Sequence, residues 1–220
     1  IFRFSLAMGT FLPLMNNEKI SASTALTACS PSDTVASMTS ENDPCYTTPE
    51  SYKVKFYEIG FCTSDPLASG TFDNSTCHIS WKNYDGYTVD LGTKTYNNMG
   101  GNTYEIRHGT YGHAYAIMNQ TWILKGKYKL KNGSTYYTKS NGSITTDESL
   151  YDNWTDDING MTGTETTGLC WDYEDTTAYG TVSAILTDGS NVTASNTATC
   201  DSAIRLIGQI DLNTPVVMDS

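Results

Sequence analysis

The residues best suited to metal binding or nucleophilic chemistry are the three histidines, His78, His108 and His113. His108 and His113 lie five residues apart with glycines between them, so a turn could bring both rings close to Glu105. Two histidines and a carboxylate are a common set of metal ligands. Such residues are more often ordinary strand or loop positions, so we predict no metal site here. His78 follows Cys77 directly, but adjacent strand residues point to opposite faces, so we expect no thiol–imidazole nucleophile.

A first acidic stretch has the oxygen ligands that calcium prefers, with Asp152, Asp156 and Asp157 close together. Aligning this stretch with an EF-hand loop, with Gly160 as the glycine, places threonines at the first and twelfth positions, where charge is needed. We expect no cofactor, and keep calcium as a possible ligand with these three residues as weak candidates for binding it. The alternative is a solvated acidic loop.

A second acidic stretch, Asp172, Glu174 and Asp175, lies beside Trp171 and Tyr173. Paired carboxylates next to aromatic rings are typical of glycoside hydrolases, but that chemistry needs a fixed separation and one raised pKa. The sequence contains no GxSxG, HExxH, P-loop or GxGxxG motif. We predict that the protein is not an enzyme, and keep a secreted glycan-active hydrolase as the third choice.

The six cysteines predict a disulfide framework, because their number is even. The sequence contains no CxxC pair, which is the spacing typical of a metal or redox site. Sequential pairing is the expected order, although the sequence leaves the connectivity open. Disulfides persist in oxidising compartments, so we expect the protein outside the cell or at its surface. The expected pairs are Cys29 with Cys45, Cys62 with Cys77, and Cys170 with Cys200.

Six N-x-S/T sequons make the chain a candidate glycoprotein, although its many serines and threonines would give nearly as many by chance. The candidate acceptors are Asn74, Asn119, Asn132, Asn141, Asn153 and Asn191.

The composition favours strands over helices, since 33 Thr, 21 Ser and 15 Tyr occur in 220 residues. Lys and Arg number 13 against 24 Asp and Glu, giving a net charge of −11 that argues against nucleic-acid binding. The charge is uneven: residues 1–93 carry −5, residues 94–139 carry +6 and residues 140–220 carry −12. These charges are either solvated faces or the two sides of a head-to-tail interface between copies.

Short alternating segments separated by turn residues predict an all-β fold, specifically a disulfide-stabilised β-sandwich of Ig-like or jelly-roll-like type. Asn132-Gly133 is a strong hairpin signal between residues 121–131 and 134–139. It places Lys127, Lys129 and Lys131 on one basic face, which could bind anionic glycans. We expect further strands at 52–61, 79–81, 87–91, 181–187 and 203–212, and a paired hairpin of 103–108 with 113–118.

An alternating apolar pattern near the start predicts an extended strand, with Phe2, Phe4, Leu6 and Met8 on one face. Three placements of this strand stay open. It lies in the chain's own sheet, it adds to a neighbour's sheet by donor-strand exchange, or it belongs to a retained signal peptide. The arrangement resembles the donor extensions of secreted pilus subunits. The apolar run of about 15 residues is too short for a membrane span, which needs about 20.

These patterns predict three parts: the extended strand at 1–15, a linker-like segment at 16–51 with Cys29 and Cys45, and a β-sandwich at 52–220. We expect a secreted structural subunit of a filament, pilus or surface layer, whose partners are copies of itself. The alternative is a carbohydrate-binding or adhesin module that uses the aromatic residues and the basic face, with Trp81, Trp122, Trp154 and Trp171 as stacking candidates.

Overall fold

The computed structural model describes residues 3–4, 46–47, 49–93, 99–157, 173–194, 200 and 203–219. Almost all regular structure in this part of the chain is β-strand, so the all-β prediction is confirmed. Two 3-10 turns, η1 (Leu91–Thr93) and η2 (Glu148–Leu150), are also present, and Cys200 has helical backbone. Among the described residues no helix is both long enough and apolar enough to cross a membrane.

The described residues fall into two compact units that interleave along the sequence. The first includes Ser51–Lys53, Asp90 and Trp122–Asp156, and the second includes Val54–Val89, 99–121 and the described residues from Asp157 onward. The expected division into parts at residues 15 and 51 stays a prediction.

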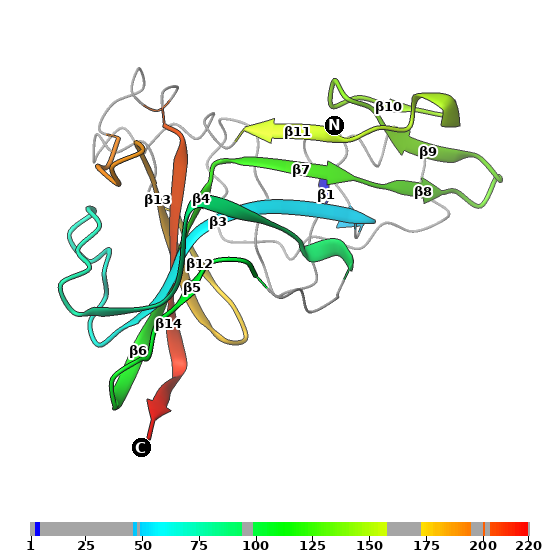
Figure 1. Cartoon of the computed structure of the whole chain (residues 1–220). Coiled ribbons are helices and arrows are strands. Elements are labelled where there is room, and N and C mark those ends of the chain that lie inside the picture. Colours follow the sequence, from blue (N-terminus) through cyan, green and yellow to red (C-terminus); the bar gives the residue numbers. More distant parts are fainter. Residues whose placement is uncertain are drawn as a thin grey trace. The chain divides into compact units, whose positions relative to one another are not determined.

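The second unit is an antiparallel sheet in the order β3-β6-β14-β13-β12 (Figure 1). β4 pairs with β3, and the short β5 pairs with β4. The strands are β3 (Ser51–Cys62), β4 (Cys77–Asp90), β5 (Asn102–Thr103), β6 (Gly109–Asn119), β12 (Tyr173–Thr176), β13 (Gly180–Thr187) and β14 (Arg205–Met218).

Both faces of this sheet are buried near its centre, because neighbouring residues on three strands are all apolar. Ile117, Ile207 and Ile185 lie side by side on one face, and the preceding row on the other face includes Leu206 and Leu186. All five side chains are at most 3% exposed. The sheet is therefore a central layer rather than a surface layer at this point.

The Cys62–Cys77 disulfide closes the chain segment that follows β3, and it confirms one expected pair. Leu67 and Phe72 from this segment pack with Cys62, Tyr115 and Ile117 in one hydrophobic cluster. The covalent link therefore holds a covering segment against the sheet. Cys200 is also disulfide-bonded, whereas the pairing of Cys29, Cys45 and Cys170 lies outside the described residues.

β6 and β14 continue past the rest of the sheet as a two-stranded ribbon (Figure 1). Their register moves from Asp211↔His113 to Val216↔Tyr111, so β14 has three more residues than β6 over this stretch. β13 ends its pairing with β14 at Leu212. β14 runs six residues beyond the predicted end at residue 212 because it pairs with β6 again from Val216 to Met218.

The first unit contains a smaller antiparallel sheet in the order β10-β9-β8, beside strands β7 and β11. Its strands are β7 (Thr121–Lys125), β8 (Lys127–Lys129), β9 (Thr135–Thr138), β10 (Ile144–Thr145) and β11 (Trp154–Asp157). The Asn132-Gly133 hairpin is confirmed, with Leu130 and Ser134 bonded across the turn and Gly133 at φ 93°. Gly126 interrupts the predicted single strand, so β7 and β8 pair with different partners.

Two strand predictions are wrong. The two separate strands predicted at 79–81 and 87–91 are one strand, β4, which ends at Asp90, because Gly86 adopts φ 75° and lets the strand continue. Residues 103–108 and 113–118 do not form a hairpin: Thr103 pairs with Trp81 of β4, whereas β6 pairs with β3 and β14. Long-range partners override the local glycine signal in both cases.

The predicted strand from Phe2 to Met8 falls mostly outside the described residues. Two short strands are described here, β1 (Arg3–Phe4) and β2 (Tyr46–Thr47), and they pair in parallel. The assignment of this segment to its own sheet or to a neighbour's sheet stays a prediction.

Gly180 gives a test of the β13–β14 pairing. It has φ 153°, and a Cβ built on it would collide with the carbonyl oxygen of Asp211 on β14. We expect Gly180→Ala to lower the free energy of unfolding by about 2–4 kcal/mol, measured by urea titration.

The matched control is Gly112→Ala on β6, where an added Cβ meets no heavy atom within 4 Å. This change should move the free energy of unfolding by no more than about 1 kcal/mol. Equal urea midpoints for the two variants would contradict the assigned close approach of β13 and β14.

Candidate functional site

The most unusual side chain in the described part of the chain is Glu58 of β3, which is only 4% exposed. A buried carboxylate is costly unless it is paired and hydrogen-bonded. Glu58 therefore identifies the place where the fold has to satisfy a charge, and its neighbours form the candidate site.

A β-bulge in β3 determines where Glu58 points. Phe56 pairs with Met118 and Glu58 pairs with Ile117, so Tyr57 is an extra residue with no partner of its own. Tyr57 packs against the cluster that contains Ile117, and the register places Glu58 beside the same residue. The bulge thus turns two consecutive side chains toward one face.

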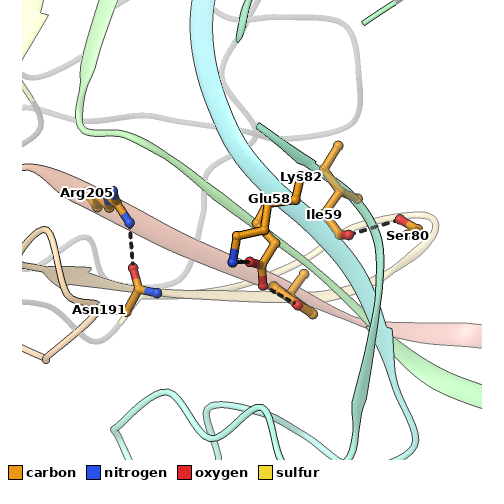
Figure 2. Close-up of polar contacts among 7 residues, drawn as sticks. Glu58, Ile59, Ser80, Lys82, Asn191 and Arg205 are labelled. Atoms are coloured by element: carbon orange, nitrogen blue, oxygen red, sulfur yellow. Dashed lines mark hydrogen bonds and ion pairs between the residues drawn. The ribbon is translucent and has the colours of Figure 1, made fainter. Parts of the chain in front are cut away.

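Two groups satisfy the Glu58 carboxylate, one at each oxygen. Lys82 Nζ on β4 lies 2.6 Å from Oε2, and the Tyr115 hydroxyl on β6 donates to Oε1 over 2.7 Å. Figure 2 shows the Glu58–Lys82 contact between β3 and β4, beside the hydrogen bond that Ser80 Oγ donates to Ile59 O over 3.0 Å. One carboxylate therefore joins three strands.

The pKa values of the two partners both rise. The hydrogen bond and the charge of Glu58 raise the pKa of Lys82, which is 28% exposed at its side chain. Burial raises the pKa of Tyr115 above its ordinary range, and the hydrogen bond to Glu58 adds to this effect. Both groups therefore strongly favour their protonated forms in the folded chain.

A second polar pair continues along the same face. Gln209 on β14 is the partner of Tyr115 in the sheet register, and its Nε2 donates to Ser183 Oγ on β13 over 2.7 Å. Gln209 is 5% exposed, and its Oε1 is buried without a hydrogen-bond partner in the described part of the chain. A polar band thus crosses five strands, β4, β3, β6, β14 and β13, and Phe72 packs against its Tyr115.

The geometry suits the Glu58 cluster to holding strands together rather than to acid–base chemistry. Both carboxylate oxygens are occupied, so Glu58 has no free position from which to accept a substrate proton. A general base needs a reacting group within hydrogen-bonding reach. The expectation that the protein is not an enzyme stays a prediction.

The first unit contains an exposed polar surface around Glu50. Lys127 Nζ lies 3.1 Å from Glu50 Oε1, the Tyr151 hydroxyl donates to Glu50 Oε2 over 2.6 Å, and Lys125 Nζ lies 4.3 Å from the Tyr151 ring centroid. The hydrogen bond from Tyr151 lowers the pKa of Glu50. Tyr137 packs against Tyr151 with ring centroids 5.2 Å apart.

The predicted basic face is present on β8 and its turn, where Lys127, Lys129 and Lys131 are all exposed. Lys127 is the cross-strand partner of Tyr137, so lysine and tyrosine share this face. Lys127 is already paired with Glu50, which leaves Lys129 and Lys131 as its more available charges. We call the surface formed by these residues with Lys125, Tyr137 and Tyr151 the Lys/Tyr face.

The prediction that the tryptophans stack against a sugar is wrong for two of the four. Trp81 is 6% exposed and Trp122 is 4% exposed, and Tyr52 packs edge-on against Trp122. These indole rings belong to the core because their strands are covered there. Trp154 is half-buried, and Trp171 lies outside the described residues.

The histidines do not come together with Glu105 as metal ligands. His113 Nδ1 lies 3.6 Å from Asp211 Oδ1, its cross-strand neighbour, and the His78 ring packs edge-on against Tyr111. The described residues contain no cluster of three His, Cys, Asp or Glu side chains that could hold a metal ion. The Cys77–Cys62 disulfide also removes the thiol that a nucleophile beside His78 would need.

The weak calcium candidates have partners of other kinds. Asp152 accepts a hydrogen bond from the backbone N–H of Asn153 over 2.7 Å, and Asp157 accepts one from the Thr121 hydroxyl. Asp156 raises the pKa of Tyr52, although burial is the larger cause. The hydrolase candidate Asp172 lies outside the described residues, as do the side chains of Glu174 and Asp175.

Four of the six sequon asparagines are exposed in turns or at strand ends, which is where a glycan can be accommodated: Asn74, Asn132, Asn141 and Asn153. Asn119 and Asn191 are half-buried. Their glycosylation stays a prediction.

Comparisons with known protein families, with curated proteins and with solved structures give no match to this chain.

Sequence reasoning missed the Glu58 cluster because Lys82 lies 24 positions after Glu58, and Tyr115 lies a further 33 positions along the chain. The three residues belong to three different strands. A charged residue within the apolar pattern of residues 52–61 was the available signal. This signal could not identify the partners of Glu58, because the strands that form β4 and β6 were predicted incorrectly.

Alkaline pH should test the role of Tyr115. Its pKa, like that of Lys82, is raised in the folded chain. The resulting contribution is complete below about pH 10, begins to fall where unfolded tyrosine and lysine ionise, and is lost as the pH rises further to the folded-state pKa. We expect Tyr115→Phe to lower the free energy of unfolding by about 1–3 kcal/mol at pH 8. That difference from the unmodified chain should shrink by pH 11, measured by urea titration.

Tyr179→Phe is the control, because Tyr179 is 70% exposed. Its effect should be small at pH 8. A Tyr115→Phe variant with an unchanged deficit from pH 8 to pH 11 would contradict the protonation argument.

Proposed function

We propose that the protein is a secreted structural subunit that assembles with copies of itself by strand addition. The segment from Phe2 to Met8 of one copy would add to the edge of β14 beyond Asn213 in the next copy. Phe2, Phe4, Leu6 and Met8 supply the alternating apolar face that such a strand needs.

The observation that carries the proposal is the ribbon formed by Gly109–Tyr111 of β6 and Val216–Met218 of β14. Beyond Asn213, whose N–H bonds to Tyr179 O, no strand of the described residues pairs with β14 on the side away from β6. Two-stranded ribbons are marginal in water and gain stability from a third strand. Natural edges of this kind are usually covered or blunted.

The side chains at this edge also suit an apolar partner. Val217 is 59% exposed and lies opposite Thr110 in the register, whereas Val216 lies opposite the buried Tyr111. An added strand with phenylalanine and leucine on one face would cover Val217. Pro215 lies within the insertion, which leaves Val216–Met218 as the regular part of the edge.

Removing the donor tests one side of the contact. We expect deletion of residues 1–9 to leave a folded, secreted chain that is monomeric by light scattering, whereas the full chain forms polymers visible by negative-stain microscopy. Burial of the four apolar side chains would contribute roughly 6–12 kcal/mol before the cost of association.

Changing the acceptor tests the other side of the same contact. Val217→Lys should abolish the polymers, and the matched control Val192→Lys, at a valine that is 62% exposed elsewhere in the second unit, should not. Polymers that persist after both the deletion and Val217→Lys would overturn the proposal.

The Lys/Tyr face favours a second function, an adhesin module that binds anionic glycans. Exposed lysines beside Tyr137 and Tyr151 combine charge with rings on which a sugar can stack. The Lys/Tyr face lies in the first unit and the β14 edge in the second, so the two functions use different residues.

A glycan array tests this second function. Binding to sulfated or uronate-rich glycans is expected to fall at least tenfold when Lys129 and Lys131 are both changed to Gln, because each removed cation weakens contact with the anion. Lys53→Gln, on β3 of the same unit, is the charge-matched control. No binding by the unmodified chain to any acidic glycan would contradict an adhesin role for this face.

A further inference from the structure

The second unit is strongly acidic, with four basic residues against fourteen acidic ones in its sequence. Lys82 is paired with Glu58, and Arg107 is exposed. The remaining two cations, Lys55 and Arg205, lie near the same aromatic ring. This concentration of positive charge in an acidic unit needs an explanation.

Tyr57, the bulged residue of β3, is the ring that both cations approach. Lys55 Nζ lies 5.5 Å from its centroid, and Arg205 Cζ on β14 lies 4.4 Å from it. These distances place the two charges within roughly 10 Å of each other, about one Debye length at 0.1 M salt. All three residues are half-buried, so solvent screens the repulsion incompletely.

Neither cation forms an ion pair with a carboxylate in the described part of the chain. The adjacent acid in sequence, Glu58, is fully used by Lys82 and Tyr115. Asp188 directly follows Thr187 of β13, the cross-strand neighbour of Arg205, and one of its oxygens accepts hydrogen bonds from the N–H groups of Ser190 and Val192. The ring attracts the cations, but it does not neutralise them.

Arg205 is held in place by an uncharged residue. Its Nη1 donates to Asn191 Oδ1 over 3.1 Å, and Figure 2 shows this contact separate from the Glu58–Lys82 contact. Asn191 has φ 64°, a left-handed conformation uncommon for residues other than glycine. The amide of Asn191 also carries two N–H donors, which adds to the donors available here.

Packing fixes the other side of the arrangement. Gly86 of β4 lies so close that an added Cβ would be 2.5 Å from Lys55 Cε and 2.9 Å from Tyr57 Cε1. The lysine stem and the tyrosine ring are therefore confined between β4 and the core cluster that Tyr57 contacts. The donors are held in position by the fold before any ligand arrives.

We propose that Lys55, Arg205 and Asn191 form a binding site for an oxyanion, the sulfate, phosphate or carboxylate group of a small ligand. Guanidinium and ammonium groups bind such oxygens through short, charge-assisted hydrogen bonds. An oxyanion between the cations would also remove their mutual repulsion. The site lies in the second unit and is independent of strand addition by the segment 2–8.

Thermal unfolding at fixed ionic strength tests the site. Sulfate, phosphate and acetate are compared with chloride, followed by a sulfated disaccharide and a uronate disaccharide, which separate a free inorganic anion from an acidic sugar. We expect at least one of these anions to raise the Tm of the full chain by several degrees. The increase should follow the one-site binding dependence on anion concentration.

Arg205→Gln and Lys55→Gln should each remove this anion-specific increase, while Arg107→Gln, the matched loss of a cation in the same unit, should keep it. Comparing variants removes the general stabilisation that sulfate gives to all proteins. If Arg205→Gln folds poorly, Lys55→Gln supplies the same comparison. An equal response of all three variants, or no response of the unmodified chain to any anion, would overturn the proposal.

Discussion

The carboxylate of Glu58 is the constraint on which the second unit depends. Its burial requires one oxygen to meet Lys82 from β4 and the other to meet Tyr115 from β6. Hydrophobic contacts tolerate small sliding of strands, whereas a buried charge with two fixed partners does not. Replacing one partner would leave an uncompensated charge, which is far more costly than losing an ordinary surface ion pair. The ion pair therefore specifies which strands are neighbours and in which register.

The β3 bulge makes this arrangement compatible with the apolar core. If Tyr57 paired regularly with Ile117, the alternation from Phe56 would turn Glu58 away from Ile117 and Tyr115. The bulged Tyr57 also supplies the ring beneath Lys55 and Arg205. The bulge thus places the ring of the cationic surface and the Glu58 carboxylate on the same face of the sheet.

The sequence predicted features whose signals are local. The strands at 52–61 and 181–187, the Asn132-Gly133 hairpin and the Cys62–Cys77 pair depend on alternation, turn chemistry and short spacing, and the structure contains all four. The sequence failed where a glycine permits a bulge as readily as a turn. Gly86 continues β4 instead of ending it, and the glycines around residue 110 lie in a strand whose partners are far away in sequence.

The candidate sites were harder to predict for the same reason. Glu58, Lys82 and Tyr115 come together only once the order β4-β3-β6 is known, and that order depends on contacts spanning up to 57 residues. Lys127, Lys129 and Lys131 could be placed on one face because a single hairpin positions them. Histidines and acidic stretches are the residue types that usually indicate a site, whereas the structure places its buried charge on residues that resemble ordinary strand positions.

The insertion in β14 has a consequence for how this chain can vary in length. Five steps along β14, from Asp211 to Val216, match two steps along β6, so odd-numbered and even-numbered residues exchange faces across the insertion. Three extra residues, an odd number, absorb this exchange, so alternation is not carried through Leu212–Pro215. The outward position of Val217 follows from its own pairing with Thr110 beyond the insertion. The number of residues in this short segment can therefore change without turning Val217 inward, as is usual for surface loops.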